Sequence, residues 1–108
     1  MWVGAITFWA VGFLLLGFGI SNMKGNISSL HSYHRKRVTE ENVKPFGRLV
    51  GMGNIIIAVS MALAGICMLL AEQAERWAIV ASATTVVGVV IGMCISFYAM
   101  IKYNGGIF

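Results

Sequence analysis

The sequence has few charged residues, and none of them lies in its three longest apolar runs. Lys, Arg, Asp and Glu make up 11% of the 108 residues, whereas 58% are hydrophobic; soluble domains are about 25% charged. The charge-free runs cover residues 2–22, 49–71 and 77–101. Each is long enough as a helix to cross a hydrocarbon core of roughly 30 Å. The lack of charge therefore excludes an ordinary soluble domain and predicts three transmembrane spans.

These spans are expected to be helices, because in lipid each backbone group must be satisfied within its own segment and three strands cannot close a barrel. No basic residue precedes the first span and no Ala-x-Ala pattern follows it, so we expect it to be retained rather than removed as a signal peptide. The five-residue connector before Trp77 predicts that the second and third spans form an antiparallel hairpin. We predict an all-α integral membrane protein with one domain, 1–108: first span 2–22, basic loop 23–48, second span 49–71, short outer loop 72–76, third span 77–101 and tail 102–108.

The basic residues are distributed unevenly between the two sides of these spans. Six of the eight lie in the loop 23–48 and Lys102 follows the third span, whereas Arg76 alone lies in the other loop. Cytoplasmic loops carry an excess of Lys and Arg, and Trp is enriched at membrane interfaces. Trp2 and Trp77 then mark the outer side. We expect a multi-pass protein of the cell membrane with its N-terminus outside and its C-terminus in the cytoplasm.

Several chemistries have no residues to support them. Ionisable residues inside spans mark ion and proton pathways, and the three spans contain no Lys, Arg, Asp or Glu. A transporter of the small multidrug-resistance type, with an embedded carboxylate and four spans, does not fit. Cys67 and Cys94 lie at different depths, too far apart for a disulfide. No phosphate-binding loop or Ser-His-Asp set is evident, so we expect no enzyme activity and no cofactor.

The loop 23–48 holds both histidines, and its polar residues are the strongest candidates for contact with another molecule. His31 and His34 are spaced to share one helical side, which zinc ligands require, but no third ligand is well placed and we predict no metal site. The basic residues lack a stacking platform, so nucleic acid is not an expected partner. We expect contacts to anionic lipid headgroups or a protein partner from His31, Tyr33, His34, Arg35, Lys36 and Arg37.

Local patterns in the same loop predict where helices begin. Apolar residues and histidines from Ile27 to Val38 share one side, which predicts a short amphipathic helix along the membrane. Thr39 followed by two glutamates is typical of a helix start with a hydroxyl cap. Pro45 fits a first turn better than a helix interior, so a helix is expected to begin close to it.

Small residues recur at helical spacing in all three spans. Membrane helices associate through small residues that let backbones approach and through interhelical hydrogen bonds. Matching depths about the short connector predicts that small faces of the second and third spans meet, with a hydrogen bond between Asn54 and Ser96. A weaker stripe of Ala5, Gly12 and Gly19 is expected to lean on this hairpin, with Gly17 outside it. The predicted pairs are Gly51 with Ala99, Asn54 with Ser96, Ala58 with Gly92, Ala62 with Gly88, and Gly65 with Thr85.

Residues 28–57, "SSLHSYHRKRVTEENVKPFGRLVGMGNIII", and the closing "KYNGGIF" resemble a family of small bacterial integral membrane proteins of unknown function. The resemblance covers about a third of the chain closely and the three-span layout more loosely. It implies a first helix, a basic cytoplasmic loop and a helical hairpin, and it supplies no activity, cofactor or catalytic residue.

Two functions are compatible with these features, and a third lacks the residues that it would need. The first is a non-enzymatic membrane protein that acts by helix association, as a homo-oligomer or as an accessory subunit of a larger complex. The alternative is a small pore or a holin-like assembly, although holins of the three-span class carry a more strongly charged tail than residues 102–108. A membrane enzyme subunit would need polar groups that face a cavity.

Overall fold

The computed structural model describes residues 2–27 and 35–106, and helices dominate this part of the chain. The long helices are α1 (Trp2–Met23), α3 (Val43–Leu70) and α4 (Arg76–Asn104), and a short 3-10 helix, η1 (Glu40–Asn42), precedes α3. No strand occurs among the described residues. All three long helices are long and apolar enough to cross a membrane. The prediction of an all-α, multi-pass membrane protein is confirmed.

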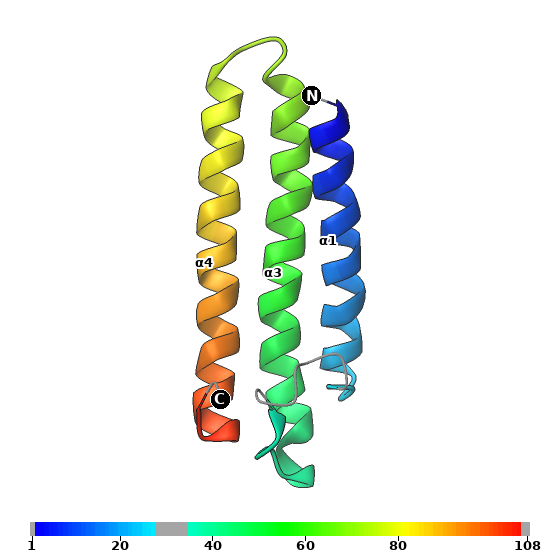
Figure 1. The fold of residues 1–108 in the computed structure, drawn as a ribbon, viewed down its shortest axis with the longest axis vertical. Coiled ribbons are helices and arrows are strands. Elements are labelled where there is room, and N and C mark those ends of the chain that lie inside the picture. Colours follow the sequence, from blue (N-terminus) through cyan, green and yellow to red (C-terminus); the bar gives the residue numbers. More distant parts are fainter. Residues whose placement is uncertain (1, 28–34, 107–108) are drawn as a thin grey trace.

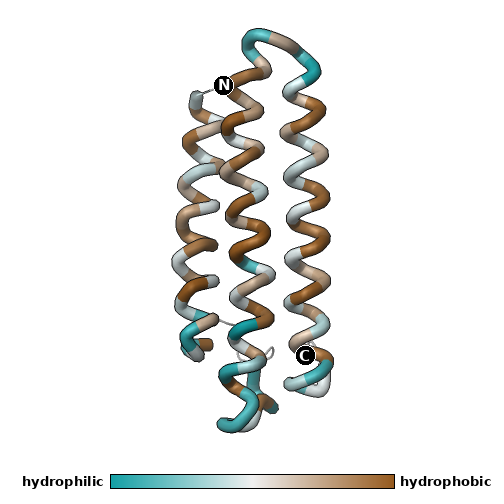
Figure 2. Tube along the Cα trace, turned by 180° about the vertical axis from the view of Figure 1, so that it is seen from behind, coloured by the Kyte–Doolittle hydropathy of each residue, from teal (hydrophilic) through white to brown (hydrophobic). Residues whose placement is uncertain are grey.

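Helix α3 lies between α1 and α4 and contacts both (Figure 1). Both α1 and α4 pack along α3, and the described residues form an elongated body of 51 × 19 × 18 Å. The start of α1 lies at the same end as the α3–α4 connector, and the last turn of α4 lies at the other end. Hydrophilic residues gather at both ends, with mostly apolar residues between them (Figure 2). We call the end formed by residues 24–27, 35–48 and 102–106 the basic end.

Helices α3 and α4 extend beyond the predicted spans. They contain 28 and 29 residues, and at about 1.5 Å per residue each exceeds a hydrocarbon core of roughly 30 Å. Helix α3 begins six residues before the predicted span, so its first turns carry Lys44 and Arg48. Helix α4 continues through Asn104 and ends at Gly105, whose positive φ of 74° suits glycine.

Helix α3 begins where Pro45 predicts, at Val43. Proline is acceptable as the third residue of the helix, because the first N–H groups have no partner within the helix. Thr39 has extended backbone angles and precedes η1, but its side chain forms no capping hydrogen bond. The position of the helix start was therefore predicted correctly, whereas the predicted cap by the Thr39 hydroxyl does not form.

A small apolar core closes the basic end. It consists of Phe46 and Val50 from α3 with Ala99 and Met100 from α4, and Ile27 and Val38 are packed against it. The proposed amphipathic helix falls mainly on residues 28–34, which lie outside the described residues. Ile27 and Val38, the ends of that predicted segment, are not helical in the structure, but both contact this core and attach the loop to the helices.

Candidate functional site

Helices α1 and α3 meet through glycines whose backbones nearly touch. A Cβ atom at Gly19 would lie 2.9 Å from the Gly51 carbonyl oxygen, and a Cβ atom at Gly51 would collide with the Gly19 carbonyl oxygen. Ala5, Gly12 and Gly19 are all buried. The weaker stripe of the first span thus forms the α1 side of a close helix–helix contact, as small residues do in membranes.

Trp9 fixes α1 against α3 nearer the end of the molecule that carries the α3–α4 connector. Its indole N–H donates a hydrogen bond of 3.1 Å to the carbonyl oxygen of Ala62. Gly65 lies against the indole ring, where a Cβ atom would collide with it. Trp9 therefore belongs to the face of α1 that contacts α3.

Helix α4 meets a different face of α3. Gly92 lies against Gly53 and Ile57, and Gly88 lies against Ser60. Cβ atoms at Gly53 and Gly92 would each lie within 2.6 Å of polar or backbone atoms of the facing helix. The two backbones approach closely here, so this contact also leaves no space for a larger residue.

The predicted pairing of the second and third spans is wrong in its choice of α3 face. Gly51 lies against Gly19 and Met23, and Gly65 against Trp9. The predicted bond between Asn54 and Ser96 is replaced by one to Asn22. The predicted depth of α4 along α3 was nearly right, because Ser96 lies beside Gly53, one residue before its predicted partner Asn54. The α3 residues of the prediction that contact α1 instead are Gly51, Asn54, Ala58, Ala62 and Gly65.

The α4 residues of that prediction lie as follows. Gly88, Gly92 and Ser96 contact α3, and Ala99 is fully buried in the core of the basic end. Thr85 donates a hydrogen bond to the Ala81 carbonyl oxygen of its own helix. It lines a groove beside α1, and the atoms nearest to Gly65 belong to Trp9 and not to Thr85.

An asparagine chain links α1, α3 and the start of the loop. The Asn54 amide donates to Asn22 Oδ1 at 3.0 Å, and the Asn22 amide donates to the carbonyl oxygen of Asn26 at 2.8 Å. Asn22 is fully buried. Since an unsatisfied amide costs free energy in an apolar setting, these bonds fix the end of α1 against α3.

We expect the Asn22–Asn54 pair to be energetically coupled. A double-mutant cycle with Asn22→Ala and Asn54→Ala should give a coupling free energy of about 1 kcal/mol, measured by unfolding in mixed micelles. The matched cycle with Asn54→Ala and Ser96→Ala tests the pair that the sequence predicts, and should give a coupling near zero. A larger coupling in the second cycle than in the first would contradict this assignment.

A second buried asparagine holds the other end of the loop. Asn104 is fully buried, and its Oδ1 accepts a hydrogen bond of 2.6 Å from the backbone N–H of Arg37. Its amide donates to the carbonyl oxygen of Gly106 at 3.0 Å. Arg37 is thereby attached to the end of α4. The sequence signal for this clamp is the asparagine that directly precedes two glycines in "KYNGGIF".

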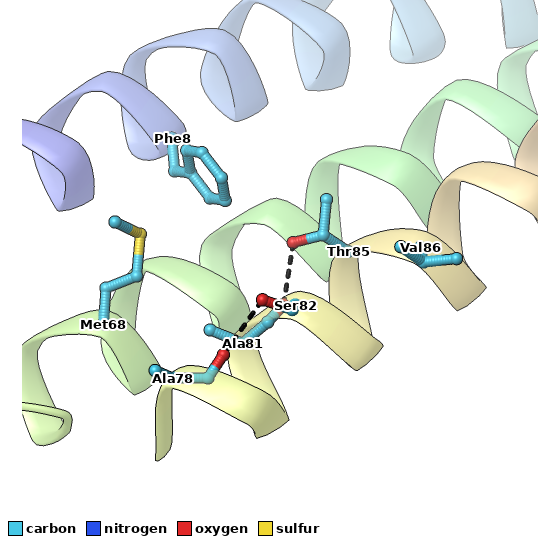
Figure 3. A pocket seen from close by; sticks show the side chains of 7 residues that line it. All are labelled: Phe8, Met68, Ala78, Ala81, Ser82, Thr85 and Val86. Atoms are coloured by element: carbon cyan, nitrogen blue, oxygen red, sulfur yellow. Dashed lines mark hydrogen bonds between the residues drawn. The ribbon is translucent and has the colours of Figure 1, made fainter. Parts of the chain in front are cut away.

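A groove of about 380 Å³ lies between α1 and α4 near the α3–α4 connector, at the end opposite the basic end. Phe8 and Met68 face the first turns of α4 across it (Figure 3). The hydroxyls of Ser82 and Thr85 donate to carbonyl oxygens of their own helix, four residues earlier. The lining side chains therefore present an apolar surface, suited to lipid or to another helix, in the groove formed by Phe8, Met68, Ala78, Ala81, Ser82, Thr85 and Val86.

The predicted loop residues are only partly described. His31, Tyr33 and His34 lie outside the described residues, whereas Arg35, Lys36 and Arg37 lie at the basic end. Within the described ranges, no group of three His, Cys, Asp or Glu side chains is placed to hold a metal ion. Cys67 is buried, whereas Cys94 is exposed on α4.

No family model, curated protein or solved structure matches this chain. The resemblance carried by residues 28–57 stays a prediction.

Proposed function

We propose that this protein is a non-enzymatic membrane protein that acts by helix association, as a homo-oligomer or as an accessory subunit of a larger membrane complex. The supporting observation is that α1 and α4 each pack along α3 with one side only. The other sides of α1 and α4 are long, apolar and exposed. Val86 and Val90 on α4 and Phe13 on α1 are more than half exposed. These faces offer lipid or another helix a surface without charged groups.

The use of polar side chains within the helices supports the same proposal. Asn54, Ser60 and Thr85 bond to groups of this chain, and every buried side-chain nitrogen or oxygen in the described residues has a partner. Asn54 links α3 to α1, whereas the hydroxyls of Ser60 and Thr85 are satisfied within their own helices. A site for a polar substrate would need such groups directed into a cavity.

We further propose that the basic end faces the cytoplasm. Seven of the eight basic residues belong to it, and the positive-inside rule then assigns the N-terminus to the outside. A C-terminal fusion to green fluorescent protein should fluoresce, and a C-terminal fusion to alkaline phosphatase should be inactive. The reverse pattern would overturn the orientation.

Association is tested in the membrane. The fluorescently labelled chain, reconstituted at low density and examined by single-molecule photobleaching, should bleach in more than one step if it is a homo-oligomer. A single step together with a stoichiometric membrane protein after mild purification supports the accessory role. A single step without such a protein would contradict the proposal. Dye leakage from vesicles at the same density would instead favour the pore alternative.

A further inference from the structure

The last turns of α4 place a cation between two aromatic rings. The Lys102 ammonium lies 5.8 Å from the centroid of the Tyr98 ring and 5.3 Å from that of Tyr103. A cation at about 6 Å from a ring is attracted to its face. Tyr98 is 53% exposed, and tyrosine favours the headgroup level of a membrane. Lys102 is therefore positioned where a helix leaves the apolar layer.

The loop brings a second cation to the same end of α4. The guanidinium of Arg37 lies against Gly105, where a Cβ atom would be 3.6 Å from Nη1. Its backbone is held by the buried Asn104 side chain. Gly105 caps the end of α4 three residues after Lys102, so Arg37 and Lys102 both lie at this end of the helix. Arg37 and Lys102 are both exposed there.

The charge of the basic end defines the ligand that suits these two cations. This end carries seven basic residues and two acidic ones, and the acids, Glu40 and Glu41, precede α3 rather than lie on α4. An arginine fork bonds phosphate oxygens in pairs, and a lysine adds a point charge. Two cations at a membrane edge, beside tyrosines, match a phosphate that is itself fixed at headgroup depth.

We propose that Arg37 and Lys102 bind the phosphate of an anionic phospholipid headgroup at the end of α4, with Tyr98 beside the glycerol region. Asn104 acts as a positioning residue, because it holds the Arg37 backbone without contacting the lipid. The proposal rests on the membrane insertion in the proposed function, and not on self-association or on orientation. A monomer can therefore pass this test while the association proposal fails.

The test uses the full chain in a neutral detergent and counts bound phosphatidylglycerol by native mass spectrometry, with phosphatidylcholine as the neutral comparison. Phosphatidylglycerol is expected to bind more tightly. Arg37→Gln and Lys102→Gln should each weaken its binding about fivefold, because each removes a charge-assisted hydrogen bond to the phosphate. Both side chains are exposed, so the variants are expected to fold.

Two matched variants separate a defined site from a general attraction to charge. Lys44→Gln removes the same charge from the first turn of α3 and should change binding less than twofold. Asn104→Ala keeps every charge but releases Arg37, and should weaken binding about threefold. An equal loss in Lys44→Gln, equal binding of the two lipids, or displacement by millimolar inorganic phosphate would overturn the proposal.

Discussion

Phe46→Ala is expected to destabilise the folded protein by about 3 kcal/mol, the cost of removing a fully buried aromatic ring. Phe46 is fully buried among Val50, Ala99 and Met100. Its ring meets Tyr103 edge to face, with centroids 6.4 Å apart and an interplanar angle of 82°. Alanine would leave a cavity between α3 and α4 and would also remove this aromatic contact, which is worth about 1 kcal/mol.

The natural control is Phe13→Ala, which makes the same chemical change on α1 at a side chain that is 79% exposed. It should alter the free energy of unfolding by less than about 0.5 kcal/mol, as surface substitutions do. Unfolding in mixed micelles, followed by circular dichroism, measures both variants. Equal effects of the two substitutions would show that the core of the basic end contributes little to stability.

The three spans were predictable because each depends on a local property of the chain. A long run without charge needs a helix in lipid, whatever its neighbours are. The relative depth of α3 and α4 was also nearly predictable, since both helices rise at about 1.5 Å per residue from one short connector. Ser96 and Gly92 accordingly lie one residue from their predicted depths on α3, beside Gly53 and Ile57.

The contact faces of α3 were not predictable in the same way, because this helix carries two stripes of small residues. One includes Gly51, Ala58 and Gly65, and the other includes Gly53 and Ser60. A five-residue connector allows either stripe to face α4. The choice depends on α1, whose Gly19 packs on Gly51, and that packing is a tertiary property without a local signal.

The candidate site at the basic end was predictable in charge but not in geometry. The run Arg35–Arg37 marks a basic surface, yet no periodic pattern joins Arg37 to Asn104, which lies 67 residues later. Their hydrogen bond depends on how the loop folds back over α4. One signal was available for Asn22: it follows Gly19 by three residues and so continues the α1 stripe.

Gly92→Leu is expected to separate α3 from α4 and to lower the free energy of unfolding by about 3 kcal/mol, at the upper end of typical overpacking costs. A Cβ atom at residue 92 would lie 2.6 Å from the carbonyl oxygen of Gly53. A backbone oxygen cannot rotate away as a flexible side chain does. The leucine therefore fits only if the two helices move apart, and the neighbouring contact of Gly88 with Ser60 is then lost as well.

Gly17→Leu is the matched control, because no atom lies within 4 Å of a Cβ built at Gly17. Both substitutions replace a helical glycine with leucine, so the gain in helix propensity, up to about 1 kcal/mol, is common to the two variants. Their difference isolates the α3–α4 contact. In mixed micelles Gly92→Leu should unfold at lower denaturant than the parent chain, and Gly17→Leu at an equal or higher concentration. If Gly92→Leu were as stable as Gly17→Leu, α3 and α4 would not pack backbone to backbone in the membrane.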